Sequence, residues 1–273
     1  MAEIVFIHGA GDSAAVWDRQ LATLGGRHRV LAIDLPGHGA RLHEQAHADH
    51  RANAAEVAAA LVAAQIQRPV LVGHSMGGAV ALTYLLGSET AGAGSIPQST
   101  VRGLVLVASG ARLRMHPAFL QAARERAEAA PTAPLTEPLV PAERCLGPNP
   151  TPEVRAWLAA QAGRATAQAV YADFQANDAF DVMARLAEVL VPTLIIGGAE
   201  DSMAPPKFQQ YLAENIPNAR LVLLPGAGHY PMAEQPAAFD QTLAEFLAQL
   251  PSPAAHRLRL PASSDRGGRP RAP

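Results

Sequence analysis

The sequence predicts an α/β fold in which a mostly parallel sheet carries helices on both faces. Three observations predict it: six short runs rich in Val, Ile and Leu have the length of strands, Ala-rich stretches separate several of them, and one long segment interrupts this alternation. Strands that alternate with helices are typical of parallel sheets built from right-handed crossovers. A chain of 273 residues is long enough to bury the core of such a domain.

The expected strands are apolar at consecutive positions, which predicts central strands that are covered on both faces. These runs are Ile4–Ile7, Val30–Ile33, Val70–Val72, Leu104–Val107, Thr193–Ile196 and Leu221–Leu224. The Ala-rich stretches between them favour helices. The clearest of these are Ala54–Ala64, Gly78–Leu86 and Ala237–Leu250.

The alternation stops between Arg112 and Arg185, in a segment far too long for a simple loop in a compact domain. Helices are expected there at His116–Ala130 and Glu153–Ala176, joined by a proline-rich stretch. We therefore predict a helical cap over residues 111–186, inserted between two parts of one core, residues 1–110 and 187–250.

The last residues, 251–273, form a segment of different composition. They carry five arginines against one aspartate among Pro, Ser and Gly, which predicts a disordered basic tail. The net charge of the whole chain is -2, so a tail of about +4 leaves about -6 for the body. No uniform basic field is available to bind nucleic acid or anionic lipid, and neither partner is expected.

The remaining composition points to a cytoplasmic protein. The single cysteine, Cys145, cannot form an internal disulfide. The opening residues, MAEIVFIHG, lack the basic region of a signal peptide. Apolar stretches such as Val189–Ile196 fall far short of the ~20 residues that span a bilayer.

The motif that carries the chemistry lies at Ser75. The residues Gly73-His74-Ser75-Met76-Gly77-Gly78 follow an expected strand and precede an expected helix, which is the context of a nucleophile elbow. Small residues at positions 73 and 77 allow a tight turn in which the serine adopts strained torsions and its hydroxyl projects from the sheet. Ser75 is therefore the predicted nucleophile.

A serine hydroxyl needs a base to take its proton and a carboxylate to orient that base. Asp201 follows the expected strand at Thr193–Ile196, and His229 follows the next one. Since both come after Ser75 and at the same edge of a parallel sheet, we predict Asp201 as the acid, with neighbouring Glu200 as the alternative, and His229 as the base.

Two backbone amides are expected to stabilise an oxyanion. The first strand runs into a loop of small residues, His8–Ser13, beside the elbow. Such a loop leaves N–H groups free to face a substrate. We assign the donors to the N–H groups of Ala10 and Met76.

Several stretches together resemble the α/β-hydrolase superfamily, and within it the serine carboxylesterases. They are HGAGDSAAVWDRQ at His8–Gln20, DLPGHG at Asp34–Gly39, GHSMGG at Gly73–Gly78, GAED at Gly198–Asp201 and GAGHYPMAEQP at Gly226–Pro236. The resemblance implies a triad of Ser75, Asp201 and His229 and structural roles for Trp17, Asp34 and His38. Most relatives carry a β-hairpin before the first of these strands, and here it is expected to be absent, which would leave a sheet edge exposed.

The identity of the nucleophile narrows the chemistry. Haloalkane dehalogenases and epoxide hydrolases of this superfamily use an aspartate at the elbow, so Ser75 instead favours acyl transfer. We expect a carboxylic ester hydrolase for a small-molecule ester of short to medium acyl chain, without cofactor or metal. The alternatives are a C–C bond hydrolase, a thioesterase or a perhydrolase on the same scaffold, or a non-catalytic binding protein.

Residues of the cap and of the motif loops are the candidates to line the substrate pocket. They are His74, Met115, Phe119, Trp157, Phe174 and Tyr230. His43, His47 and His50 have a spacing that could hold a metal, but their polar surroundings favour a solvated loop or pocket rim.

Overall fold

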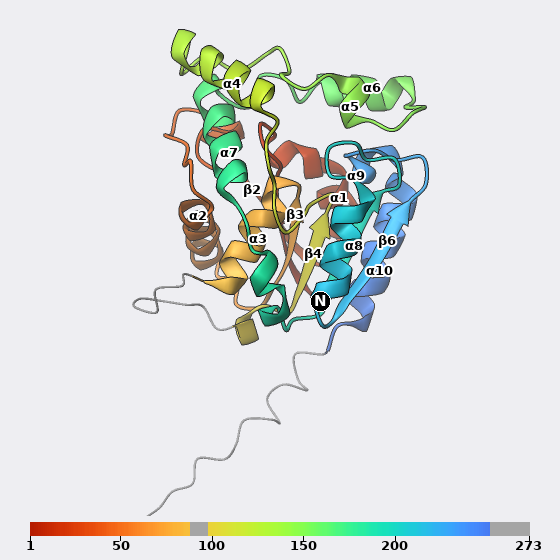
Figure 1. Ribbon diagram of the computed structural model, residues 1–273. Helices are drawn as coiled ribbons and strands as arrows, with labels where there is room; N and C mark the ends of the chain where they lie inside the picture. Colours follow the sequence, from red (N-terminus) through yellow and green to blue (C-terminus); the bar gives the residue numbers. More distant parts are fainter. Residues whose placement is uncertain (88–97, 252–273) are drawn as a thin grey trace, which may run out of the picture.

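A computed structural model of the chain describes residues 1–87 and 98–251 and contains one parallel sheet (Figure 1). The predicted tail lies outside these residues apart from its first position. The strand order is β2-β1-β3-β4-β5-β6, and every adjacent pair is parallel. The strands are β1 (Glu3–Ile7), β2 (Arg29–Ile33), β3 (Pro69–His74), β4 (Gly103–Val107), β5 (Thr193–Gly198) and β6 (Ala219–Leu224).

All six expected strands are present, but two of them are not central. Val30–Ile33 belongs to β2 and Leu221–Leu224 to β6, and these strands form the two edges of the sheet in the described part of the chain. Most of their side chains are only half-buried. Apolar content predicts which strands are covered by helices, but it does not show whether a neighbouring strand lies on each side.

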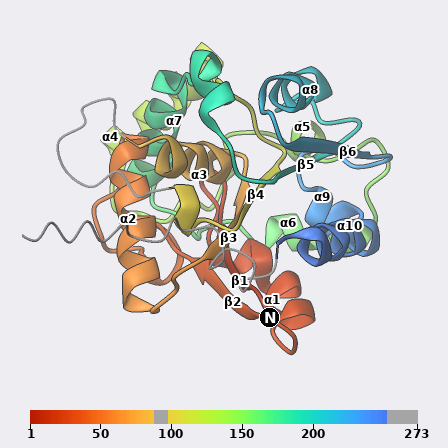
Figure 2. The ribbon, with the colours of Figure 1, turned by 90° about the horizontal axis from the view of Figure 1, so that it is seen from below.

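Helices cover both faces of the sheet, as predicted (Figure 2). The side chains of each strand alternate between two cores. Val5 and Ile7 pack with the helices of one face, whereas Ile4 and Phe6 pack with those of the other. On the first face lie α2 (His50–Ala63), α3 (Met76–Leu86) and α8 (Pro206–Asn215); on the second lie α1 (Asp18–Leu24) and α10 (Pro236–Gln249). None of the helices in the described ranges combines the length and apolar character needed to cross a membrane.

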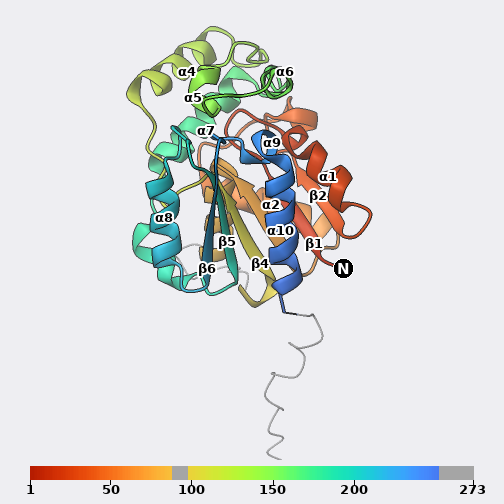
Figure 3. The same ribbon diagram turned by 90° about the vertical axis from the view of Figure 1, so that its right-hand side faces the viewer.

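The segment between β4 and β5 carries four α-helices, which gather over the carboxyl ends of the strands (Figures 1 and 3). Arg112 and Asp181 form an antiparallel bridge, so the chain leaves and rejoins the core at one point. We call the residues between them the cap. Its helices are α4 (Pro117–Ala129), α5 (Ala142–Cys145), α6 (Pro152–Ala159) and α7 (Ala167–Ala179).

The expected helix at Glu153–Ala176 is wrong in its continuity, because the structure divides it into α6 and α7. Gly163 has a φ of 77°, a left-handed conformation that ends helical geometry. The next helix, α7, starts at Ala167 and is capped by Thr166, whose hydroxyl accepts a hydrogen bond from the N–H of Ala169 at 3.1 Å. The alanines on both sides of this turn conceal it from an analysis of composition.

Candidate active site

Ser75 lies in a strained turn between β3 and α3. Its φ of 50° and ψ of -114° are unusual for a residue with a side chain. A Cβ at Gly73 would overlap the backbone of Gly77, so only glycine allows the strand and helix to approach this closely. The Ser75 N–H donates to the carbonyl of Val107 at 2.8 Å, which ties the turn to β4.

Asp201 and His229 lie together at the carboxyl ends of β5 and β6. Nδ1 of His229 is 2.9 Å from Oδ2 of Asp201, and both side chains are buried. The other carboxylate oxygen of Asp201 accepts from the N–H groups of Met203 and Ala204 at 2.8 and 2.9 Å. Glu200, the alternative acid, is exposed and accepts from the backbone of Gly226 instead.

The electrostatic surroundings of His229 favour its protonated form. Burial by itself disfavours a charged imidazole, but the negative charge and the hydrogen bond of Asp201 outweigh it and raise the pKa of His229 above the ordinary value of 6.5. Nε2 of His229 makes no hydrogen bond to any residue within the ranges 1–87 and 98–251. This nitrogen is therefore able to exchange a proton with a group in the adjacent cavity.

The predicted oxyanion donors border the same cavity as Ser75. Ala10 follows β1 in the loop of small residues, and Gly9, Ala10 and Gly11 all line the cavity. Met76 is the first residue of α3, and such an N-terminal amide has no carbonyl partner within its own helix. The positive end of the helix dipole also lies at this point.

The cavity lies between core and cap and has a volume of about 540 Å³. Ser75 and His229 both line it, so the elbow and the base open into one space. Five of the six residues expected to form a substrate pocket line it as well. They are His74, Met115, Phe119, Phe174 and Tyr230.

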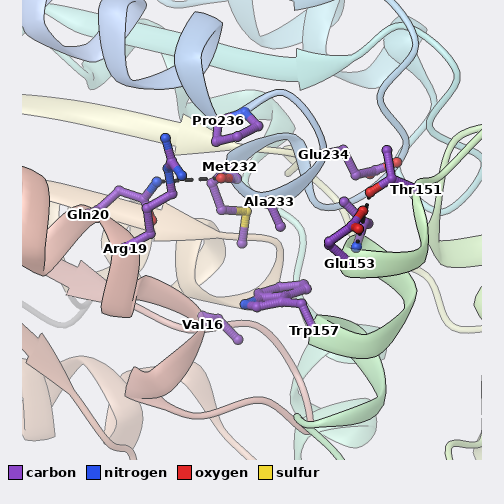
Figure 4. A pocket seen from close by; sticks show the side chains of 11 residues that line it. Val16, Arg19, Gln20, Thr151, Glu153, Trp157, Met232, Ala233, Glu234 and Pro236 are labelled. Atoms are coloured by element: carbon purple, nitrogen blue, oxygen red, sulfur yellow. Dashed lines mark hydrogen bonds between the residues drawn. The ribbon is translucent and has the colours of Figure 1, made fainter.

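The sixth, Trp157, lies elsewhere. It lines a neighbouring cavity of about 480 Å³ together with Val16 and Met232 of the core and Thr151 of the cap (Figure 4). Trp157 also contacts Tyr230 edge to face, with the ring centroids 5.4 Å apart. Because the opposite face of α6 lines the main cavity, this packing turns the indole away from Ser75.

Asp12 is a buried carboxylate in the main cavity that the sequence analysis did not single out. The Tyr230 hydroxyl donates to it at 3.3 Å, and Nδ1 of His74 lies 3.5 Å from it. Burial, followed by the charge of Asp12, raises the pKa of Tyr230 well above its ordinary value. Tyr230 therefore stays protonated and donates to Asp12, which holds its ring beside His229.

A second buried histidine and aspartate connect the cap to the core. Nε2 of His38, in the turn after β2, lies 3.0 Å from Oδ2 of Asp173 in α7, and both side chains are almost fully buried. The same oxygen accepts from the N–H of Gly11 at 2.8 Å. Asp173 thus fixes the loop that contains Ala10.

His38 is held in its charged form by two acceptors. Burial disfavours the charge, but Asp173 outweighs this effect and raises the pKa of His38. Its Nδ1 lies 3.0 Å from the carbonyl of Pro36, so each ring nitrogen donates to an oxygen. Burial and the neighbouring charge of His38 lower the pKa of His8 to about 4. The neutral His8 accepts from the N–H of Leu35.

The histidines near residue 45 have separate partners. His47 contacts Glu56, and the buried His50 contacts Asn177 in the cap.

The thiol of Cys145 is buried. This burial, followed by the negative charge of Asp12, raises the pKa of the thiol to about 12. The carbonyl of Cys145 accepts from the N–H of His229 at 2.7 Å, which ties α5 to the loop of His229.

Comparison with known proteins agrees with this architecture. The model of the Alpha/beta hydrolase family matches residues 4–242. RutD of Pseudomonas savastanoi pv. phaseolicola, named as a candidate carbamate hydrolase, is 30% identical over 89% of this chain and 93% of its own length. A pimeloyl-[acyl-carrier protein] methyl ester esterase of Neisseria meningitidis is 31% identical over 90% of this chain and 93% of its own.

Among solved structures, a thermophilic esterase from Thermogutta terrifontis is similar throughout. The two superpose with a TM-score of 0.77 at 25% identity, covering 91% of this chain and 90% of the esterase. The cap and the core are both included in an alignment of this extent.

Proposed function

Because the chain is a hydrolase that belongs to the alpha/beta hydrolase family, we propose that it cleaves carboxylic esters of short to medium acyl chains. Ser75 is the nucleophile, His229 the base and Asp201 the residue that orients the base. One observation carries this proposal: a strained serine at the head of α3 shares a cavity with a histidine whose Nδ1 lies 2.9 Å from a buried aspartate.

The chemistry follows from the free nitrogen of His229. Oγ of Ser75 attacks the ester carbonyl carbon while Nε2 of His229 takes its proton, and Asp201 stabilises the resulting imidazolium. The carbonyl oxygen becomes an oxyanion that the N–H groups of Ala10 and Met76 stabilise. The C–O bond then breaks, His229 returns the proton to the alcohol, and water repeats the sequence to release the acid from Ser75.

The relatives support this reaction class and also indicate its nearest competitor. The Neisseria relative is named as a methyl ester esterase and RutD as a candidate carbamate hydrolase. Esters and carbamates both present a carbonyl carbon to a serine, but the nitrogen of a carbamate makes its carbonyl less electrophilic. An ester is therefore the substrate class that the unaided triad serves best.

The proposal is tested with p-nitrophenyl esters of increasing acyl length, together with a p-nitrophenyl carbamate. Ester turnover that is abolished by a serine-directed organophosphate supports it. Replacing Ser75 by alanine should lower kcat/KM by at least on the order of 10⁴-fold while the fold is retained. Undiminished turnover in that variant, or turnover of the carbamate alone, would contradict it.

A further inference from the structure

The charged side chains that line the main cavity are almost all positive. Four arginines line it, and Asp12 is its only carboxylate among the described residues. Asp12 is buried and already accepts from Tyr230. The arginines are Arg112, Arg114, Arg144 and Arg155. This cavity contrasts with the body of the protein, whose net charge is about -6 without the tail.

Two of these arginines are already paired at the stem of the cap. Nη1 of Arg112 lies 3.6 Å from Oδ2 of Asp181. Arg114 donates to the carbonyl oxygen of Asp178. Their guanidinium groups hold the two ends of the cap together, and Asp181 in part neutralises the charge of Arg112.

The other two, Arg144 and Arg155, form no ion pair with any residue in the described part of the chain. Both are exposed at the cavity. The guanidinium carbon of Arg144 lies 5.6 Å from the centre of the Phe119 ring, a cation–π contact that holds the charge against another residue of the cavity wall. Each guanidinium keeps its planar set of donors for an external anion.

The backbone around Arg144 is fixed against the catalytic groups. Its carbonyl accepts from the hydroxyl of Ser202, the residue after Asp201, at 2.8 Å. The carbonyl of the next residue, Cys145, accepts from the N–H of His229 at 2.7 Å. The backbone of Arg144 is therefore fixed beside Ser202 and His229 by α5, and its guanidinium lies over Phe119 at the cavity.

Arg155 lies on the face of α6 that borders the cavity. Leu158 and Ala159 line the cavity too, three and four residues after Arg155 on the same face of α6, and Ala162 follows in the turn beyond the helix. This wall is therefore positive at Arg155 and apolar toward and beyond the end of α6. A substrate of matching form has an apolar chain and an anionic end.

We propose that the enzyme acts on esters that carry a second, anionic group, a carboxylate or a phosphate, which Arg144 and Arg155 bind while Ser75 attacks the ester carbonyl. This inference rests on the proposed esterase activity. It goes further by assigning an anion-binding subsite to the cap. A half-ester of a dicarboxylic acid is the simplest substrate of this form.

The test compares two substrates with the same acyl chain on the same enzyme preparation. One is the mono-p-nitrophenyl ester of glutaric acid, and the other is its methyl p-nitrophenyl diester, which lacks the charge. The wild type should prefer the anionic ester, and the preference should fall as salt is raised because exposed charges are screened. A third substrate with a terminal phosphate distinguishes the two sources of negative charge.

Replacing both Arg144 and Arg155 by glutamine should lower the ratio of kcat/KM for the anionic ester to that for the neutral ester by about tenfold or more, from the loss of charge-assisted hydrogen bonds. The ratio is insensitive to the fraction of folded enzyme. Arg144→Lys keeps the positive charge and should therefore retain part of the preference for the anionic ester. The control Arg124→Gln removes an exposed arginine of α4 that pairs with Glu128 outside the cavity, and it should leave the ratio unchanged.

A binding measurement keeps this inference separate from the esterase proposal. Monomethyl glutarate and dimethyl glutarate are titrated calorimetrically into the Ser75→Ala protein, which needs no turnover. Tighter binding of the monoester that is lost in the Arg144→Gln/Arg155→Gln background supports the subsite even if p-nitrophenyl esters are not cleaved. Equal binding of both compounds, or a ratio of rates that survives the double substitution, would overturn it.

Discussion

Two buried histidine–aspartate pairs of the described residues, His229–Asp201 and His38–Asp173, are similar in distance but differ in the partner of the second ring nitrogen. In both, a ring nitrogen lies about 3 Å from a carboxylate, 2.9 Å for His229 and Asp201 and 3.0 Å for His38 and Asp173. In both, the aspartate outweighs burial and raises the histidine pKa. The second nitrogen of His38 donates to a backbone carbonyl, whereas that of His229 has no partner in the described ranges and borders the cavity of Ser75.

Under the proposed mechanism, a buried histidine–aspartate pair acts as a base only where the second ring nitrogen remains free. One N–H group of His38 binds Asp173 of the cap and the other binds the carbonyl of Pro36 in its own turn, so neither ring nitrogen is left to exchange a proton. In His229, Nδ1 is bound to Asp201, and Nε2 remains available for proton exchange. We expect the first pair to govern stability and the position of the Ala10 loop, and the second to govern the chemical step.

The largest expected difference between the two pairs is in kcat, when each aspartate is replaced separately by asparagine. Asp201→Asn allows His229 to adopt the wrong tautomer, and kcat should fall by on the order of 10⁴-fold. Asp173→Asn removes one charge from a pair that touches no substrate, and kcat should fall by only about tenfold through the Gly11 contact. Steady-state kinetics on both variants measure this difference. Equal losses would break the distinction between the two pairs.

The next largest effect concerns stability. Asp173→Ala leaves the His38 imidazolium buried without its carboxylate, and the free energy of unfolding should fall by about 3–5 kcal/mol. In a protein of this size that corresponds to a decrease in Tm of roughly 10 °C or more. Thermal denaturation gives the value. Gln175→Ala, at an exposed position of the same helix, is the matched control and should change stability by less than about 0.5 kcal/mol.

The smallest effect is a shift in pH dependence. His229 accepts a proton from Ser75 only when neutral, so kcat/KM should rise with pH and reach half its plateau above pH 6.5, the ordinary pKa that Asp201 raises. Asp201→Asn should move this midpoint to lower pH, because burial then acts without an opposing charge. Asp173→Asn should leave it in place. A profile of the residual activity against pH tests each statement.

The same pKa shifts make the stability of the folded protein fall as pH rises, whereas kcat/KM is expected to rise. Both raised histidine pKa values favour the protonated folded state. Their contribution to stability is complete below the unfolded pKa of about 6.5 and is lost as pH rises through the folded value. The pH at which these two pairs stabilise the protein most is therefore one at which His229 cannot act as a base.

Much of the site was predictable because its signals are local. The elbow at Ser75 needs small residues at fixed spacing beside a strand, and Asp201 and His229 each follow a strand of the same sheet. The pairing of His38 with Asp173 was not predictable in this way. The two residues are 135 positions apart, and the sequence analysis treated His38 as a turn residue. Asp12 likewise has no pattern around it that indicates burial against Tyr230.

The sequence by itself determined the strands, the order of the candidate site residues along the chain and the helical segment between β4 and β5, because hydrophobic periodicity and turn residues act over a few neighbours. Only the tertiary structure decided which strands form the edges, where Glu153–Ala176 breaks, and that Trp157 lies in a neighbouring cavity. These properties depend on which surfaces meet after folding, and no local pattern encodes that contact. The different roles expected for His229 and His38 also depend on the tertiary structure, because it places a cavity beside one ring and a backbone carbonyl beside the other.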